Sequence, residues 1–166
     1  MDSASLLIAL RLIHIITAAA WFGSALMLVL FLTPMVQREG VEGSRLIQRM
    51  VRAGLTKWMA ILSGVGVLAG FALYARNAAY SGAGWSQTRV GMTLGIGGVL
   101  GLAAAIIGVA VVGRAAKKIA DLGDTLGSPE TETTRIQAQD RLSRAGMLAV
   151  VLIVLSTAAM AVARYV

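Results

Sequence analysis

One histidine and two methionines are the side chains of this sequence whose types and positions suggest chemistry. His14 is the only histidine and lies in an apolar stretch near the start of the chain. Met92 and Met160 lie near the ends of two later apolar stretches. A neutral imidazole ligates transition metals and haem iron, and imidazole with thioether sulfurs suits Cu(I). His14, Met92 and Met160 therefore form a candidate metal-ligand set.

Two neighbours of His14 bear on such a site. Arg11 precedes His14 by three residues and can pair with a carboxylate, such as a haem propionate. Trp21 follows His14 by seven residues, which places it on the same helix face about 10 Å further along. Its indole N–H needs an acceptor at that depth, and we expect Thr17 or a neighbouring carbonyl to supply one. We take His14, Arg11 and Trp21 as candidate cofactor-binding residues.

A purely structural role for the same residues stays open. Methionine is a common filler of apolar bundles, and a lone histidine near a helix end can bond a headgroup, a water or a carbonyl. A bis-histidine haem within one chain is excluded, although one across a dimer interface is not. The chain contains no cysteine, which excludes disulfides, thiolate metal sites, iron–sulfur clusters and covalently attached c-type haem.

The elements that must position these residues are four apolar segments. Hydrophobic residues make up 57% of the chain and charged residues 14%, which is outside the range of soluble domains. The segments are approximately 8–36, 56–76, 89–114 and 144–164, each long enough to cross a bilayer. Their continuous apolar character predicts helices, since backbone groups in lipid must bond internally. We expect an all-α, integral membrane four-helix bundle that forms a single domain, 1–166.

Basic residues predict how the four spans are oriented. Of the 15 Lys and Arg residues, only Arg11, Arg76, Arg89 and Arg164 lie on the side of the termini. The rest flank or occupy the two longer connections, which the positive-inside rule places in the cytoplasm, with both termini outside. We therefore expect a multi-pass protein of the cell inner membrane. The net charge of +7 indicates attraction to anionic headgroups at the inner face and not a nucleic-acid footprint.

Local patterns predict helix ends and packing. Ser44 is the expected N-cap of a basic helix that continues through Arg45, Arg49 and Arg52 into the second span. The third helix is expected to continue for two or three turns into the cytoplasm, with a break at Gly127-Ser128-Pro129. Ser128 and Pro129 are expected to start the fourth helix. Hydroxyls within the spans are expected to bond back to their own helices. Gly97, Gly101 and Ala105 form a ladder of small residues that favours close helix packing.

The first span carries a family resemblance. Leu12-Ile13-His14, followed by Trp21-Phe22-Gly23, resembles the first helix of the CopD-like copper-resistance membrane proteins. It is also similar to the bacterial four-helix membrane protoporphyrinogen oxidase and related small membrane families. The resemblance implies copper handling or haem binding for His14 alone. A lysine that serves the oxidase family within a later span has no counterpart, because Lys57 flanks span 2 and spans 3 and 4 contain none.

These observations predict a membrane module that binds haem b or copper near the outer face through His14. We expect it to be a homo-oligomer or a subunit of a larger redox or metal-handling assembly, and not a catalytic subunit by itself. The alternative is a cofactor-free accessory or scaffold subunit whose small-residue ladders pack against partner helices. A transporter or channel is less favoured, because the spans lack acidic residues and proline breaks near the midplane.

Overall fold

The computed structural model describes residues 3–82 and 84–166, and these residues are helical with short connections. The α-helices are α1 (Ser3–Leu26), α2 (Thr33–Arg38), α3 (Gly40–Arg52), α4 (Leu55–Ser81), α5 (Arg89–Ile107), α6 (Arg114–Asp121) and α7 (Pro129–Val162). Two π-helical segments, η1 (Met27–Leu32) and η3 (Gly108–Gly113), join α1 to α2 and α5 to α6. Short 3₁₀ turns occur at η2 (Trp85–Gln87), η4 (Gly123–Thr125) and η5 (Ala163–Tyr165).

Four of these helical runs are long and apolar enough to cross a membrane. They cover Ala4–Arg38, Leu55–Ser81, Arg89–Asp121 and Pro129–Tyr165. Each contains one of the four predicted spans, so the prediction of an all-α, multi-pass membrane bundle is confirmed. Many large apolar side chains on these helices are exposed, as expected for surfaces that face lipid.

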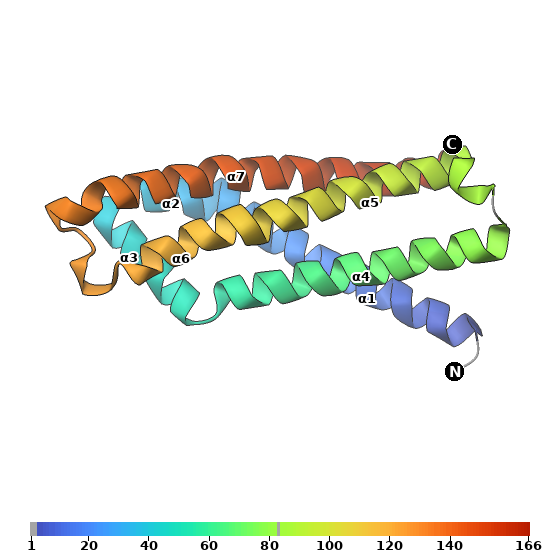
Figure 1. Cartoon of the computed structure of the whole chain (residues 1–166), viewed down its shortest axis with the longest axis horizontal. Helices are drawn as coiled ribbons and strands as arrows, with labels where there is room; N and C mark the ends of the chain where they lie inside the picture. The colour runs from blue at the N-terminus through green and yellow to red at the C-terminus, as the bar shows by residue number, and fades with distance from the viewer. Residues whose placement is uncertain (1–2, 83) are drawn as a thin grey trace.

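The four long helices form two antiparallel pairs, α1 with α4 and α5 with α7, and the pairs contact each other along the bundle. Figure 1 shows α5 beside α7, and α1 crossing from α4 at one end towards α7 at the other. Both termini lie at one end, which we call the terminal end. The opposite end carries α3, α6 and the connection between α6 and α7, and we call it the basic end.

Small residues allow α5 and α7 to approach closely, as the ladder in span 3 predicts. A Cβ placed on Gly97 would lie 3.2 Å from the carbonyl oxygen of Ser156. Ser156 itself corrects the expectation that the hydroxyls bond only to their own helices, because its Oγ donates to the carbonyl of Gly97, 2.7 Å away. Thr17, Thr33, Ser63, Thr93 and Thr157 do bond back to carbonyls of their own helical runs.

Ser44 is not an N-cap, and this prediction is wrong. Helix α3 begins at Gly40, so Ser44 lies in its second turn, fully buried, and donates to the carbonyl of Gly40. Helix α3 also does not continue into the second span, because the chain turns at Gly54, which has a φ of 96° that favours glycine. Two glycines and a serine give residues 40–44 a composition typical of a turn, yet this segment is helical in the packed structure.

The third helical run continues beyond its apolar span, as predicted, for the eight residues of α6. Helix α6 ends at Asp121, and Gly123, with a φ of 56°, turns the chain before the expected break at Gly127. The start of the fourth helix is as predicted, with Ser128 at the N-cap position, Pro129 in the first turn and Glu130 and Glu132 near the N-terminus. The Ser128 hydroxyl contacts Thr131 Oγ1 instead of capping a backbone N–H.

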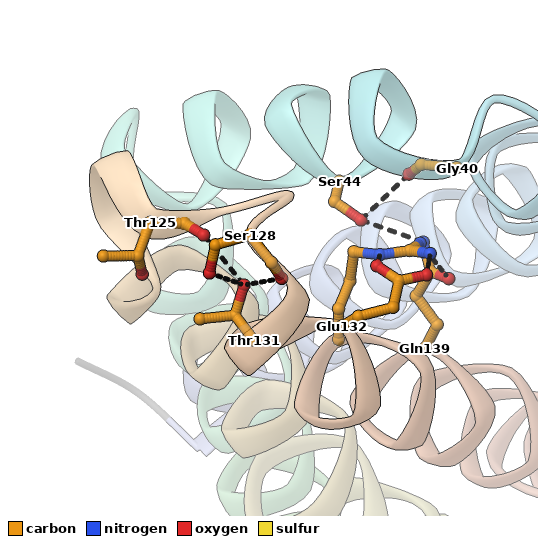
Figure 2. A network of polar contacts seen from close by, with 8 residues as sticks. Gly40, Ser44, Thr125, Ser128, Thr131, Glu132 and Gln139 are labelled. Carbon is orange, nitrogen blue, oxygen red and sulfur yellow. Dashed lines mark hydrogen bonds and ion pairs between the residues drawn. The ribbon is translucent and has the colours of Figure 1, made fainter.

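A polar network fastens α3 to α7 at the basic end. Figure 2 shows Ser44 between Gly40 and Gln139, whose Nε2 donates to the serine oxygen at 2.9 Å. Gln139 Oε1 accepts from the Arg135 guanidinium, which also donates to both carboxylate oxygens of Glu132. Ser44, Arg135 and Gln139 are buried, so this chain of bonds satisfies groups that would otherwise be costly to enclose.

Candidate functional site

His14 lies on α1 where that helix packs against α4. Its Nδ1 is 2.8 Å from the carbonyl oxygen of Gly66, one of the small residues of the second span. A Cβ placed on Gly70, one turn further along α4, would lie 2.9 Å from the Cε1 of His14. The half-buried imidazole therefore occupies the space beside Gly70, while a Cβ on Gly66 would meet Thr17 instead, 3.2 Å from its Oγ1.

The hydrogen bond to Gly66 determines which ring nitrogen of His14 is free. A carbonyl oxygen can only accept, so Nδ1 carries the proton. In the neutral imidazole, Nε2 then keeps its lone pair. An Nδ1–H bonded to a backbone carbonyl is the usual outer support of a histidine that ligates a metal through Nε2. The geometry at His14 is thus compatible with metal or haem ligation through Nε2.

Arg11 lies one turn before His14 and is exposed. Within the described part of the chain it forms no ion pair. Its guanidinium is therefore available to an anion that approaches this face of α1, such as a carboxylate or a headgroup phosphate.

Trp21 is buried in the interior of the bundle, away from the α1–α4 contact that holds His14. It packs in a cluster with Ala104, Ala105, Val150 and Ile153, which belong to α5 and α7. Because α1 crosses the bundle, one helix face meets α4 at His14 and the bundle interior at Trp21. Among the described residues the Trp21 indole forms no hydrogen bond with Thr17 or with a neighbouring carbonyl, and the Thr17 hydroxyl donates to the carbonyls of Ile13 and His14.

Met92 and Met160 lie on the other helix pair. Met160 on α7 packs against α5, where a Cβ on Gly97 would lie 3.1 Å from its Cγ, and Met92 on α5 is 49% exposed. Figure 1 shows the start of α1 beside α4 and the end of α7 beside α5, on different sides of the terminal end. The contacts described for the imidazole of His14 are with Gly66 and Gly70 of α4, and neither methionine is among them.

Carboxylates and further imidazoles do not complete a metal site around His14. Among the side chains that the structure describes, no group of three or more His, Cys, Asp or Glu gathers in a way that could hold a metal ion.

Gly66 and Gly70 are the site residues that sequence reasoning did not connect to His14. Both belong to the small residues of the second span, and their four-residue spacing was the available signal. Their spacing shows that they lie on one face of α4, but not the point along α4 at which α1 crosses it. They are partners of His14 because the crossing lies at these two residues.

The likeness to known families is confined to the first span. Within that span His14 packs against α4, whereas Trp21 is buried in the interior of the bundle. Comparison of the chain with protein-family models, with curated proteins and with solved structures gives no match, so the resemblance rests on Leu12-Ile13-His14 and Trp21-Phe22-Gly23 and stays a prediction.

Proposed function

We propose that this protein is a membrane module that binds haem b or copper through Nε2 of His14 and works as a subunit of a redox or metal-handling assembly. The observation that carries the proposal is the 2.8 Å bond between His14 Nδ1 and the Gly66 carbonyl, which leaves Nε2 as the free nitrogen. Haem or copper bound there would supply one-electron chemistry. The chain itself would supply a ligand, its orientation and an apolar setting.

The proposed orientation places the basic end in the cytoplasm and His14 towards the outer face of the inner membrane. The positive-inside rule supports it, because the basic end carries eleven of the 15 Lys and Arg residues. The fold places both termini at the same end, which such an orientation requires.

One imidazole supplies one ligand, and we propose that the second comes from another subunit. His14 is half-buried on the α1–α4 contact, near the lipid-facing side of α1 where Ile13 and Ile15 are exposed. The histidine of a second copy can meet it there, whereas Met92 and Met160 lie on the other helix pair. With haem as cofactor, Arg11 is placed to pair with a propionate.

The second candidate function is a cofactor-free scaffold subunit. The observation that favours it is the fit of His14 against Gly70 together with its bond to the Gly66 carbonyl, since these contacts join α1 to α4 with no cofactor. The extensive exposed apolar surface then packs against partner helices.

An absorption spectrum with metal analysis, on protein purified from its native membrane, tests both functions. The matched variants are His14→Asn and His14→Ala, because an asparagine amide can reproduce the Nδ1–H donor to Gly66 but offers no counterpart of Nε2. The cofactor proposal expects a Soret band or stoichiometric copper in the wild type, lost in both variants, while Asn retains the thermal stability of the apoprotein. A wild type with neither signal, and a fixed partner that still co-purifies with His14→Asn, would establish the scaffold instead.

Methionine ligation has its own readout. Met92→Leu and Met160→Leu keep apolar volume and remove the thioether. If the spectrum or the copper content is unchanged in both, the second ligand is not a methionine of this chain. Loss in either variant would assign that sulfur to the site.

A further inference from the structure

A cavity of about 290 Å³ lies within the half of the bundle nearest the basic end. Residues of α1, η1 and α2, of α3 and α4, of η3 and α6, and of α7 line it, so all four helical runs contribute to its walls. Trp21 and Ile153 line it, together with Ala60 and Ser63 of α4. It is distinct from the His14 site, which does not contribute to its lining.

Two irregularities of the helices and a set of small side chains explain why this space is not filled. Segment η1 precedes Pro34, which has no backbone N–H to continue α-helical bonding, and the Thr33 hydroxyl donates to the carbonyl of Leu28. Segment η3 is bounded by Gly108 and Gly113, both of which line the cavity. Such π-helical turns are frequent at functional sites.

Most of the lining is apolar, with hydroxyls at three positions. Thr33 and Ser63 donate their protons to backbone carbonyls of their own helical runs. The Thr56 hydroxyl has no hydrogen-bond partner among the described residues. An apolar cavity of about half this volume stays dry and binds benzene or xenon. The space therefore suits a hydrocarbon group better than ordered water.

The cavity is partly open, and two cations are among its exposed lining residues. Val109, Arg114 and Lys117 line it and are exposed. Lys117 is paired with Asp121 at 2.9 Å, whereas Arg114 has no acidic partner among the described residues. An apolar interior with exposed cations in its lining complements a molecule that has a hydrocarbon chain and an anionic head.

We infer that this cavity binds the hydrocarbon chain of an anionic amphiphile, with a carboxylate or phosphate head held by Arg114 and Lys117. About 290 Å³ is at the low end of ligand pockets, so the cavity takes one chain and not two. The ligand enters sideways from the bilayer, past Val109. This site is independent of the proposed function at His14 and would exist with or without a cofactor there.

Trp21 provides a direct probe of the cavity, since it is one of the lining residues. In a Trp58→Phe, Trp85→Phe background Trp21 is the remaining tryptophan, because the chain has three. We would titrate this protein in neutral detergent with dibromostearate, dibromo-acyl phosphatidylglycerol and dibromo-acyl phosphatidylcholine, whose bromines quench fluorescence on contact. The expected result is saturable quenching by an anionic probe and none beyond bulk exposure by phosphatidylcholine. Saturable quenching by dibromostearate alone would identify the ligand as a free fatty acid, and saturable quenching by the phosphatidylglycerol probe would identify it as a membrane lipid.

Three variants complete the test. Ala60→Leu fills the cavity and should abolish saturable quenching. Arg114→Gln should weaken binding about tenfold, as expected for loss of a charge-assisted hydrogen bond, whereas Lys118→Gln, an exposed neighbour that does not line the cavity, should leave it unchanged. Equal quenching by phosphatidylcholine, or unchanged saturable quenching in both Ala60→Leu and Arg114→Gln, would overturn the inference. Arg114→Gln keeps the proposal testable if Ala60→Leu does not fold.

Discussion

The hydroxyl of Ser156 on α7 lies against Gly97 of α5 and donates a 2.7 Å hydrogen bond to its carbonyl. A Cβ on Gly101, one turn further along α5, would lie 3.1 Å from the Oγ of Ser156. His14 meets Gly66 and Gly70 of α4 in the same way. Each helix pair is thus joined by a polar side chain that donates to the carbonyl of one glycine and packs beside a second glycine four residues later.

Ser156→Ala tests whether the bond to Gly97 stabilises the α5–α7 pair. Loss of an interhelical hydrogen bond in a membrane protein costs about 0.6–1.7 kcal/mol, and we expect a lower free energy of unfolding by that amount. Thr157→Ala is the matched control, because the Thr157 hydroxyl donates to Ile153 of its own helix. Reversible unfolding in mixed micelles measures both variants, and equal losses in the two would contradict a specific role of Ser156.

Ser44→Ala tests the network between α3 and α7. The substitution leaves the buried Nε2 of Gln139 without the acceptor it has at 2.9 Å, which costs about 1–3 kcal/mol. Ser81→Ala, at an exposed serine, should change nothing measurable. Proteolysis of the connection between α6 and α7 gives a second readout, since detachment of α3 should speed cleavage there. A Ser44→Ala protein as stable as Ser81→Ala would show that the network adds nothing to stability.

Acid sensitivity should follow Glu132, which lies before the membrane-crossing part of α7. The side-chain hydrogen bond from Arg135 holds the pKa of this carboxyl below its ordinary value of 4.5. The stabilisation is therefore present above pH 4.5 and is lost as the pH falls through that value towards the lowered pKa. We expect the thermal midpoint of the wild type to fall over this range.

Glu132→Gln removes the titrating group, so the thermal midpoint should fall less steeply with decreasing pH, a part of the profile that we call the acid limb. Glu130→Gln, an exposed neighbour that forms no ion pair within the described residues, should retain it. Parallel acid limbs in wild type and Glu132→Gln would assign the sensitivity to other groups.

The sequence predicts the four helices well because their signal is local. A run of apolar residues long enough to cross a bilayer must be helical, whatever its neighbours are. The same holds for Ser128 and Pro129, whose preference for a helix start is a property of those residues. The small-residue ladder of Gly97 and Gly101 also identifies a packing face without knowledge of the partner helix.

Features that depend on the packing of distant segments could not be predicted in the same way. Ser44 has the chemistry of an N-cap, but its surroundings are set by Gln139, 95 residues away in the chain. The partner of His14 depends on where α1 crosses α4, and the cavity depends on two π-helical turns. Helical periodicity specifies none of these. It shows which face of a helix a residue lies on, but not the position along the helix at which another helix crosses it.

Gly70→Ala tests the fit of His14 against α4, because the new Cβ would lie 2.9 Å from Cε1 of the imidazole. The ring must shift and lose its bond to Gly66, so we expect a loss of about 1 kcal/mol in the free energy of unfolding. Gly64→Ala is the matched control on the same helix, where a Cβ meets nothing within 4 Å.

A double-mutant cycle makes this assignment specific. In a His14→Ala background the imidazole is gone, so Gly70→Ala should cost nothing beyond the effect of Gly64→Ala. The same cycle bears on the proposed cofactor, because a displaced imidazole should also lose a bound haem or copper, visible as a reduced Soret band or copper content. If Gly70→Ala costs as much without His14 as with it, the cost arises elsewhere on α4, and the two glycines do not position the histidine.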